Sequence, residues 1–94
     1  MQIKVRLMGI FREANGLREV TLDLPDNSTV GSAIHTLIGD DKFLESMIWD
    51  TDVNSPSPKA LIMLDGVEIN NLQGKETPIE PGQELVLLSV VHGG

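Results

Sequence analysis

The sequence predicts an α+β fold in which a mixed β-sheet is covered on one face by one main helix. Runs of alternating polar and apolar residues lie at 2–11 and 19–24, and two more lie at 60–69 and 84–91. Alternation with a period of two is typical of strands. Between these pairs, residues 30–38 repeat apolar positions at the spacing of a helix. A hairpin, a crossover helix and returning strands together favour a single mixed sheet.

The first two runs are expected to pair as a hairpin. Asn15-Gly16 lies between them, and this dipeptide accepts positive φ at both central turn positions. The predicted core face carries Ile3, Val5, Leu7 and Phe11 from the first run, and Val20, Leu22 and Leu24 from the second.

The main helix is expected to begin after Pro25, with Thr29 or Ser28 as the N-cap residue, and to end at Gly39. Gly31 weakens the first turn by about 1 kcal/mol relative to alanine, and its missing Cβ would allow close approach to the sheet. The apolar stripe consists of Val30, Ala33, Ile34, Leu37 and Ile38.

A short second helix is predicted in the segment "DDKFLESMIW" at 40–49. Its apolar residues, Phe43, Leu44, Met47 and Ile48, are available for packing. The loop that follows contains Pro56 and Pro58, which disfavour regular structure.

The second half of the chain is expected to return to the sheet. The run "ALIMLDGVEI" turns tightly at Asp65-Gly66, with a short partner strand at 67–69. An irregular link at 70–82 is expected to be pinned by Leu72 and Ile79, and the strand at 84–91 should lie beside the first strand. This order is a β-grasp arrangement in one domain at 1–91, with 92–94 as a flexible tail.

More apolar residues occur than one covered sheet face needs. Met63, Val86 and Leu88 are predicted to point away from the helix, with Val90 beyond them and Lys4 and Arg6 on the neighbouring strand. Exposed apolar patches of this kind usually bind a partner. The alternatives are that the link at 70–82 covers these residues, or that the predicted register is wrong by one residue.

Composition excludes several classes of protein. The chain has 94 residues, no cysteine and two histidines, so disulfides, thiolate chemistry and a metal site are not expected.

The net charge is −7, and residues 40–94 carry ten carboxylates against three lysines. Such a surface repels phosphate backbones, which makes a basic protein surface a better partner than nucleic acid. No apolar run is long enough for a membrane helix and no signal peptide is visible, so a cytoplasmic protein is expected.

The end of the chain is the one place where chemistry is predicted. "VVHGG" follows an apolar strand and finishes in Gly93-Gly94. Without a Cβ, two glycines can enter a narrow channel, and the terminal carboxylate can be approached from any side. We therefore expect another enzyme to act on Gly94, with His92 as the hinge into the tail, because no motif within the fold is typical of an active site.

These segments together resemble the ubiquitin-like sulfur carriers. The resemblance rests on "MQIKVRLMGIFREANG", "STV", "LIMLDGVEI", "NNLQGKETPIEPGQELVLL" and "VVHGG", and it spans nearly the whole chain. The group includes the small subunit of molybdopterin synthase, the sulfur carrier of thiamine synthesis, the archaeal small modifiers and the eukaryotic ubiquitin-related modifier. The opening looks closest to the molybdopterin-synthase branch. That branch typically has two prolines where Ser89-Val90 stand here, and "HGG" looks more like the ubiquitin-related modifier.

The resemblance implies a protein without catalysis or a cofactor of its own. An ATP-dependent activating enzyme would adenylate the carboxylate of Gly94, and sulfur transfer would give a thiocarboxylate for molybdopterin-type cofactor synthesis or tRNA thiolation. The activating enzyme, or a synthase large subunit, would dock on the face around Met63, Val86 and Leu88. The protein alone is expected to be a monomer.

Two alternatives stay open at this point. In one, Gly94 is joined to lysines of target proteins, so that the chain acts as a ubiquitin-like modifier. In the other, the chain is an interaction module that uses the outer sheet face and whose C-terminus is not reactive.

Overall fold

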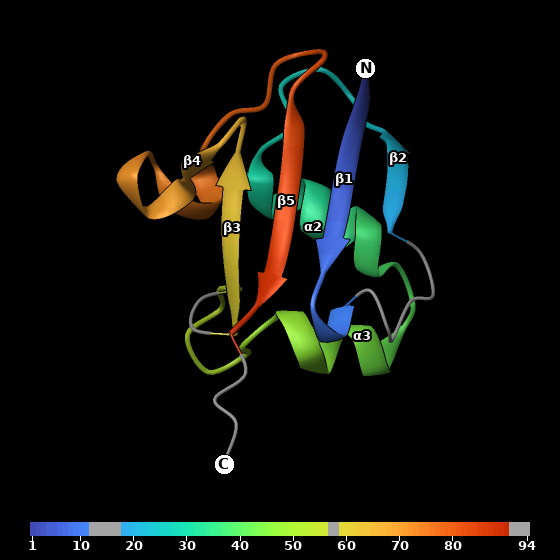
Figure 1. Ribbon diagram of the computed structural model, residues 1–94, viewed down its shortest axis with the longest axis vertical. Coiled ribbons are helices and arrows are strands. Elements are labelled where there is room, and N and C mark those ends of the chain that lie inside the picture. The colour runs from blue at the N-terminus through green and yellow to red at the C-terminus, as the bar shows by residue number, and fades with distance from the viewer. Residues whose placement is uncertain (12–17, 57–58, 91–94) are drawn as a thin grey trace.

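The computed structural model describes residues 1–11, 18–56 and 59–90. Within them, five strands form one mixed sheet in the order β2-β1-β5-β3-β4. The helix α2 crosses one face of this sheet, and α3 lies beyond the end at which β1 and β5 finish (Figure 1). This arrangement confirms the predicted α+β class. The elements in chain order are β1 (Gln2–Met8), β2 (Glu19–Asp23), α2 (Val30–Ile38), α3 (Lys42–Ile48), β3 (Ala60–Leu64), β4 (Val67–Glu68), the 3-10 turns η1 (Ile69–Asn71) and η2 (Gly74–Glu76), and β5 (Glu84–Ser89).

The first two strands pair antiparallel, with Gln2 opposite Asp23 and Arg6 opposite Glu19. This pairing confirms the predicted hairpin, although its predicted turn at Asn15-Gly16 lies outside the described residues. The core face is as expected from the alternation. Ile3, Val5, Leu7, Phe11, Leu22 and Leu24 are buried, and Val20 is partly buried against them.

The last strand occupies the centre of the sheet. β5 runs parallel to β1 and antiparallel to β3, as expected for a strand that lies beside the first. Leu85 and Leu87 are fully buried. Within the described residues the strand ends at Ser89, and the amide of Val90 donates a hydrogen bond to the carbonyl oxygen of Lys59 at 3.2 Å. Val91, the predicted last residue of the strand, lies outside the described residues.

The main helix begins with a reciprocal cap. The hydroxyl of Thr29 accepts a hydrogen bond from the amide of Ser32 at 3.2 Å, and the hydroxyl of Ser32 accepts one from the amide of Thr29 at 2.9 Å. This pair satisfies amides that have no partner within the helix. Ser28, the alternative cap, instead donates its hydroxyl to the carbonyl oxygen of Pro25. The stripe packs as expected, with Val30, Ala33, Ile34 and Ile38 buried and Leu37 partly buried.

Gly31 does allow a close approach, but its neighbour is the turn η2 and not the sheet. A Cβ at this position would lie 3.1 Å from the carbonyl oxygen of Lys75 and 3.3 Å from the Cβ of Lys75. A backbone hydrogen bond from Val30 to Thr77, at 2.9 Å, holds the link against the same end of the helix. The link at 70–82 therefore packs on the helix side of the molecule.

Gly31→Ala is expected to lower the free energy of unfolding by about 1 kcal/mol. Alanine favours a helix by up to about 1 kcal/mol over glycine, but crowding of a packed region costs about 1–3 kcal/mol, and here the crowded atoms belong to backbone. Urea unfolding measures the change. Thr36→Ala, at an exposed position of α2, is the matched control and should leave stability unchanged or slightly higher. A more stable Gly31→Ala protein would show that η2 moves freely.

The short helix α3 buries a narrower stripe than expected. Leu44 and Ile48 are buried and Met47 packs partly against the core, as predicted. Phe43 is 59% exposed, so the prediction that it packs was wrong. Leu44 and Ile48 are four residues apart and share one face, whereas Phe43 lies about 100° from Leu44 around the helix. Trp49, directly after the helix, fills the core instead and is 4% exposed.

The link between β4 and β5 is held by different residues from those expected. Ile79 is buried, as predicted, but Leu72 is 44% exposed and does not pin the link. Thr77 is buried instead, and its hydroxyl donates to the carbonyl oxygen of Gly74 at 2.7 Å and accepts from the amide of Gln73 at 3.0 Å. β4 covers only two residues, because Ile69 already begins η1. The tight turn at 65–66 is confirmed by positive φ at both residues.

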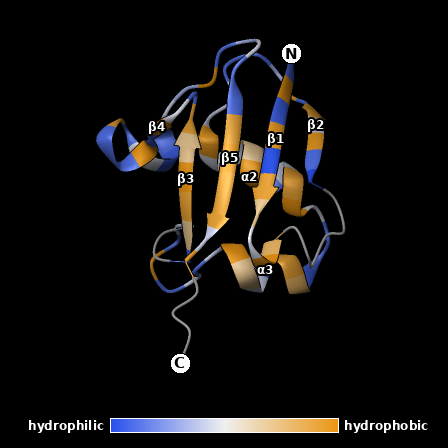
Figure 2. Cartoon of the chain, in the orientation of Figure 1, coloured by the Kyte–Doolittle hydropathy of each residue, from blue (hydrophilic) through white to orange (hydrophobic). Residues whose placement is uncertain are grey.

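This packing leaves the sheet with one covered face and one open face. β3 and β5 are coloured as apolar along most of their length in Figure 2, as expected for strands with apolar residues on both faces. None of the described helices is long and apolar enough to cross a bilayer.

Candidate functional site: the open sheet face and the chain end

The predicted reactive end lies outside the described residues. His92, Gly93 and Gly94 follow residue 90, the last that the structure describes, so the structure tests neither their predicted roles nor the domain boundary at Val91. The structure does describe the residues that lead into them. β5 ends at Ser89, at the α3 end of the molecule (Figure 1).

The end of β5 is fastened to the end of β1. The hydroxyl of Ser89 accepts a hydrogen bond from the amide of Ile10 at 3.1 Å. Gly9, between the strand and Ile10, has a φ of +66°, and a Cβ there would lie 2.3 Å from the Ser89 hydroxyl oxygen. The positive φ favours glycine, and any other side chain would displace the Ser89 hydroxyl from its hydrogen bond with Ile10. The last strand is therefore held on both sides up to Ser89, by β1 and by β3.

The predicted outward residues do lie together on the open face. Met63 on β3 and Arg6 on β1 are both opposite Val86 on β5, so these three form one row across the sheet. Leu88 lies two residues further along β5 on the same face, and Val90 beyond it is 38% exposed. Met63, Val86 and Leu88 are partly exposed.

Both alternatives to an exposed patch are wrong. The alternation of buried and half-buried residues along β3 and β5 follows the predicted register, with Leu85 and Leu87 inside. The link at 70–82 packs against α2, through Gly31 and Thr77, on the opposite side of the sheet. It therefore does not cover the outward residues.

The structure adds two residues to the patch. Met8 and Leu61 lie opposite Leu88 on either side, so Met8, Leu88 and Leu61 form a second apolar row next to the first. Met8 is 41% exposed. Both residues alternate with buried neighbours on their strands, so they share the outer face, but the alignment between strands that brings them to Leu88 is not visible in the sequence. We call Met8, Leu61, Met63, Val86 and Leu88 the apolar patch.

Charged side chains border the apolar patch along β1 and β2 and at the start of β5. Lys4 lies 3.8 Å from the carboxylate of Glu19, and Arg6 lies 3.9 Å from that of Glu84. All four side chains are at least about one-third exposed, so these pairs contribute little stability.

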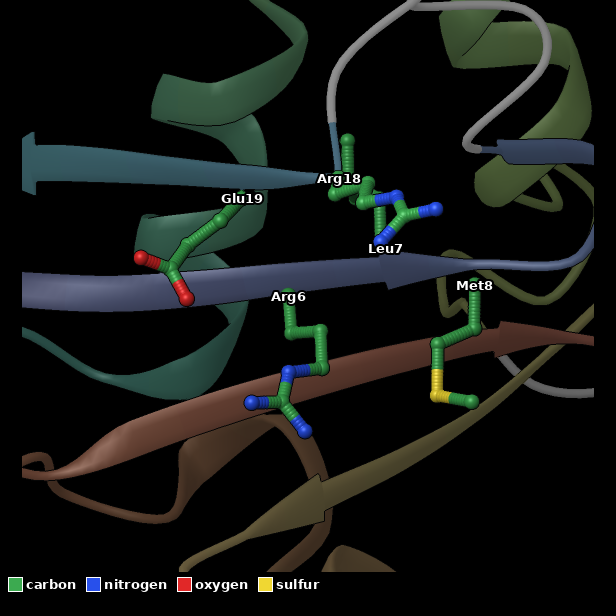
Figure 3. Close-up of a pocket in the computed structure, with 5 residues that line it drawn as sticks. All are labelled: Arg6, Leu7, Met8, Arg18 and Glu19. Carbon is green, nitrogen blue, oxygen red and sulfur yellow. The ribbon is translucent and has the colours of Figure 1, made fainter.

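A groove of about 300 Å³ lies at this border, lined by Arg6, Leu7, Met8, Arg18 and Glu19 (Figure 3). Arg6 extends over β5, and Arg18 extends from the start of β2 toward β1 (Figure 3). Arg18 was not predicted as a site residue, because nothing in the sequence shows that it reaches the face of Met8.

The described part of the chain offers no constellation typical of catalysis. It holds no group of three or more His, Asp or Glu residues that could bind a metal ion, and no buried side-chain polar atom there lacks a partner. The ring of His35 packs against that of Trp49 at 4.1 Å between centroids, which is a packing role.

Comparison with known proteins shows that the chain matches the model of one protein family. The model of the ThiS family matches residues 5–94, which is nearly the whole chain and includes the terminal glycines. The curated small archaeal modifier protein 3 of Haloferax volcanii is 26% identical over 95 residues, and the alignment covers all of both chains.

Solved structures agree with this match. The crystal structure of SAMP1 from Haloferax volcanii has a TM-score of 0.85 and 26% identity, with full coverage of both chains. The solution structure of small archaeal modifier protein 1 from Methanosarcina acetivorans has a TM-score of 0.82 and 28% identity, covering 99% of this chain and 96% of that one. The likeness therefore extends over the fold as a whole and not over one motif.

Proposed function

Because this chain belongs to the ThiS family of ubiquitin-like, β-grasp sulfur carriers and small modifiers, we propose that it carries sulfur as a thiocarboxylate on Gly94. The observation that supports this most is the reach of the family match. It runs to residue 94, so the terminal Gly93-Gly94 is part of the shared sequence. The chain itself acts as the carrier, and other proteins supply the catalysis.

The proposed chemistry takes place at one carbonyl carbon. An activating enzyme joins the Gly94 carboxylate to the adenylyl group of ATP and releases pyrophosphate, which gives the carbonyl a good leaving group. Hydrosulfide then attacks that carbon through its sulfur and loses its proton to water. The new carbon–sulfur bond forms as the carbon–oxygen bond to AMP breaks, and AMP leaves with that electron pair. The product is a thiocarboxylate, whose sulfur is a better nucleophile than a carboxylate oxygen. The receiving pathway is molybdopterin-type cofactor synthesis or tRNA thiolation.

The absence of cysteine fits this chemistry. The sequence contains no thiol that would compete for the activated acyl group within the same chain. The sulfur must then come from outside the protein.

The apolar patch supports a docking role beside the chain end. It lies on β1, β5 and β3, and β5 is the strand that leads into the tail. A partner seated on the patch, with Val90, Lys4 and Arg6 at its edge, is therefore close to Ser89 and Val90, the last described residues before the tail in the sequence. We propose that the activating enzyme, or a synthase large subunit, binds here.

The proposal is tested by the intact mass of the protein. The chain is incubated with the activating enzyme of its own organism, ATP and a sulfur source, and we expect the mass change for one oxygen replaced by sulfur. Fragmentation should place the change on Gly94. A chain that keeps its unmodified mass, although the enzyme turns over another carrier, would contradict the proposal.

A second function is favoured by the names of the relatives. The curated relative and the two solved structures are small archaeal modifiers, so the same adenylate on Gly94 is also proposed to form an amide with lysines of target proteins. Higher-mass species on immunoblots, lost when Gly93-Gly94 is removed, would support conjugation. Detection of the thiocarboxylate without such species would support the carrier role and contradict conjugation.

A further inference from the structure

We propose that the groove formed by Arg6, Met8 and Arg18 is a subsite that binds a carboxylate group of the partner protein. It would select a docking segment that carries an acidic side chain next to an apolar one. This inference deepens the proposed function and rests on it, because the same sheet face is the proposed docking surface.

The charge of this border differs in sign from that of the whole protein. The chain carries a net charge of −7. Among the described residues of the border, the positive ones are Lys4, Arg6 and Arg18, against Glu19 and Glu84. The border is therefore locally positive, and an acidic segment is drawn to it more strongly than to the remaining surface. The charge of the whole chain had favoured a basic partner surface, but the groove favours an acidic one.

The two carboxylates at the border are already engaged with other cations. Glu19 lies near Lys4 and Glu84 lies near Arg6, each at nearly 4 Å. Within residues 1–11, 18–56 and 59–90, no carboxylate lies at ion-pair distance from Arg18. Its guanidinium group keeps donors for a further acceptor, and a planar fork of this kind binds a carboxylate with two parallel hydrogen bonds.

The apolar row beside the groove strengthens such a contact. Met8 lines the groove and is also the first member of the row Met8, Leu88 and Leu61. An apolar side chain seated on that row would exclude water from one side of the groove. Charge-assisted hydrogen bonds there would then be screened less than those at an open surface.

The preference is tested directly with two short peptides, titrated into the isotope-labelled full chain and followed by NMR. Both are acetylated and amidated: one is Ser-Leu-Glu-Leu-Ser and the other is Ser-Leu-Gln-Leu-Ser. We expect the glutamate peptide to bind about fivefold more tightly at low salt, because one partner of the hydrogen bond is then charged. The amide signals of Arg6, Met8 and Arg18 should shift most.

Variants show whether the preference comes from the groove. Arg6→Gln and Arg18→Gln should each reduce binding of the glutamate peptide toward that of its glutamine twin. Lys42→Gln removes the same charge from α3, where Lys42 is 89% exposed and outside the border, and should change nothing. Equal binding of the two peptides, no binding of either at millimolar concentration, or shifts centred elsewhere would overturn the inference.

A second measurement separates this inference from the proposed function. ATP–pyrophosphate exchange is followed with the activating enzyme at increasing concentrations of the chain. The double variant Arg6→Gln/Arg18→Gln should raise the half-saturating concentration about tenfold, and Lys42→Gln should not. Unchanged half-saturation in the double variant would overturn the inference for this partner. If the wild-type chain supports no ATP–pyrophosphate exchange at any concentration, that result would contradict the proposed function. The peptide titration would still test the groove on its own.

Discussion

Leu87→Ala is expected to lower the free energy of unfolding by roughly 2–5 kcal/mol. Leu87 is fully buried at the centre of β5, with Leu7 of β1 and Ile62 of β3 opposite it. The truncated side chain would leave a cavity between the sheet and α2 that these neighbours cannot fill. For a domain of this size, the melting temperature should fall by roughly 10 °C or more. Urea and thermal unfolding followed by circular dichroism measure both quantities.

Leu88→Ala is the matched control for this prediction. It removes the same atoms from the next residue of the same strand, but from the half-exposed outer face. We expect it to cost about 1 kcal/mol or less, because part of that surface is in water already. Its main effect should be weaker binding of the activating enzyme. Equal losses of stability in the two variants would show that the outer face is covered in solution, and the docking proposal would then fail.

The strands and their faces could be predicted because two independent signals agree there. Period-two alternation identified the strands, and a shift of one residue would have moved Leu87 to the open face and Leu88 into the core. The paired turn residues Asp65-Gly66 fixed the register of β3 against β4. When one face of a strand is buried, a register shifted by one residue would move all its apolar residues to the open face, so the register is well determined.

The short and irregular segments could not be predicted in the same way. α3 has seven residues, which is too short for the pattern to show whether Phe43 or Leu44 faces inward. In the link, Leu72 and Ile79 were predicted to pack, and the sequence did not draw attention to Thr77. Thr77 nevertheless takes the buried position, since its hydroxyl satisfies two backbone groups of η2. Gly31 was recognised as a site of close approach, but its neighbour comes from a segment more than 40 residues away.

The candidate site, like the fold, could be predicted only in part. Met63, Val86 and Leu88 followed from alternation along single strands. Leu61 and Met8 join them only through the pairing of β5 with β3 and β1. Arg18 lies just before β2, and its reach toward Met8 depends on the path of one side chain at the sheet edge. Contacts between strands thus decide which outward residues act together.

Deleting Gly94 is expected to lower ATP-dependent activation by at least about 100-fold. The deletion moves the terminal carboxylate back by one residue, or about 3.5 Å. Reactions on a bound substrate depend steeply on position, and a misplacement of about 1 Å can cost about 100-fold in rate. The melting temperature should not change, because every described core residue comes before Ser89 in the sequence. ATP–pyrophosphate exchange and thermal unfolding of the same samples measure the two effects.

Gly94→Ala is the control for length. It keeps the length of the tail and a terminal carboxylate but adds a Cβ beside that carboxylate. A smaller loss of activation than in the deletion would show that the position of the carboxylate matters more than the absence of a side chain. The deletion also separates the classes of function. An interaction module that uses only the apolar patch would keep its cellular function without Gly94, whereas a carrier or a modifier would lose it. Full function of the shortened chain would therefore contradict both proposed roles of the terminal glycine, and the apolar patch alone would have to explain what the protein does.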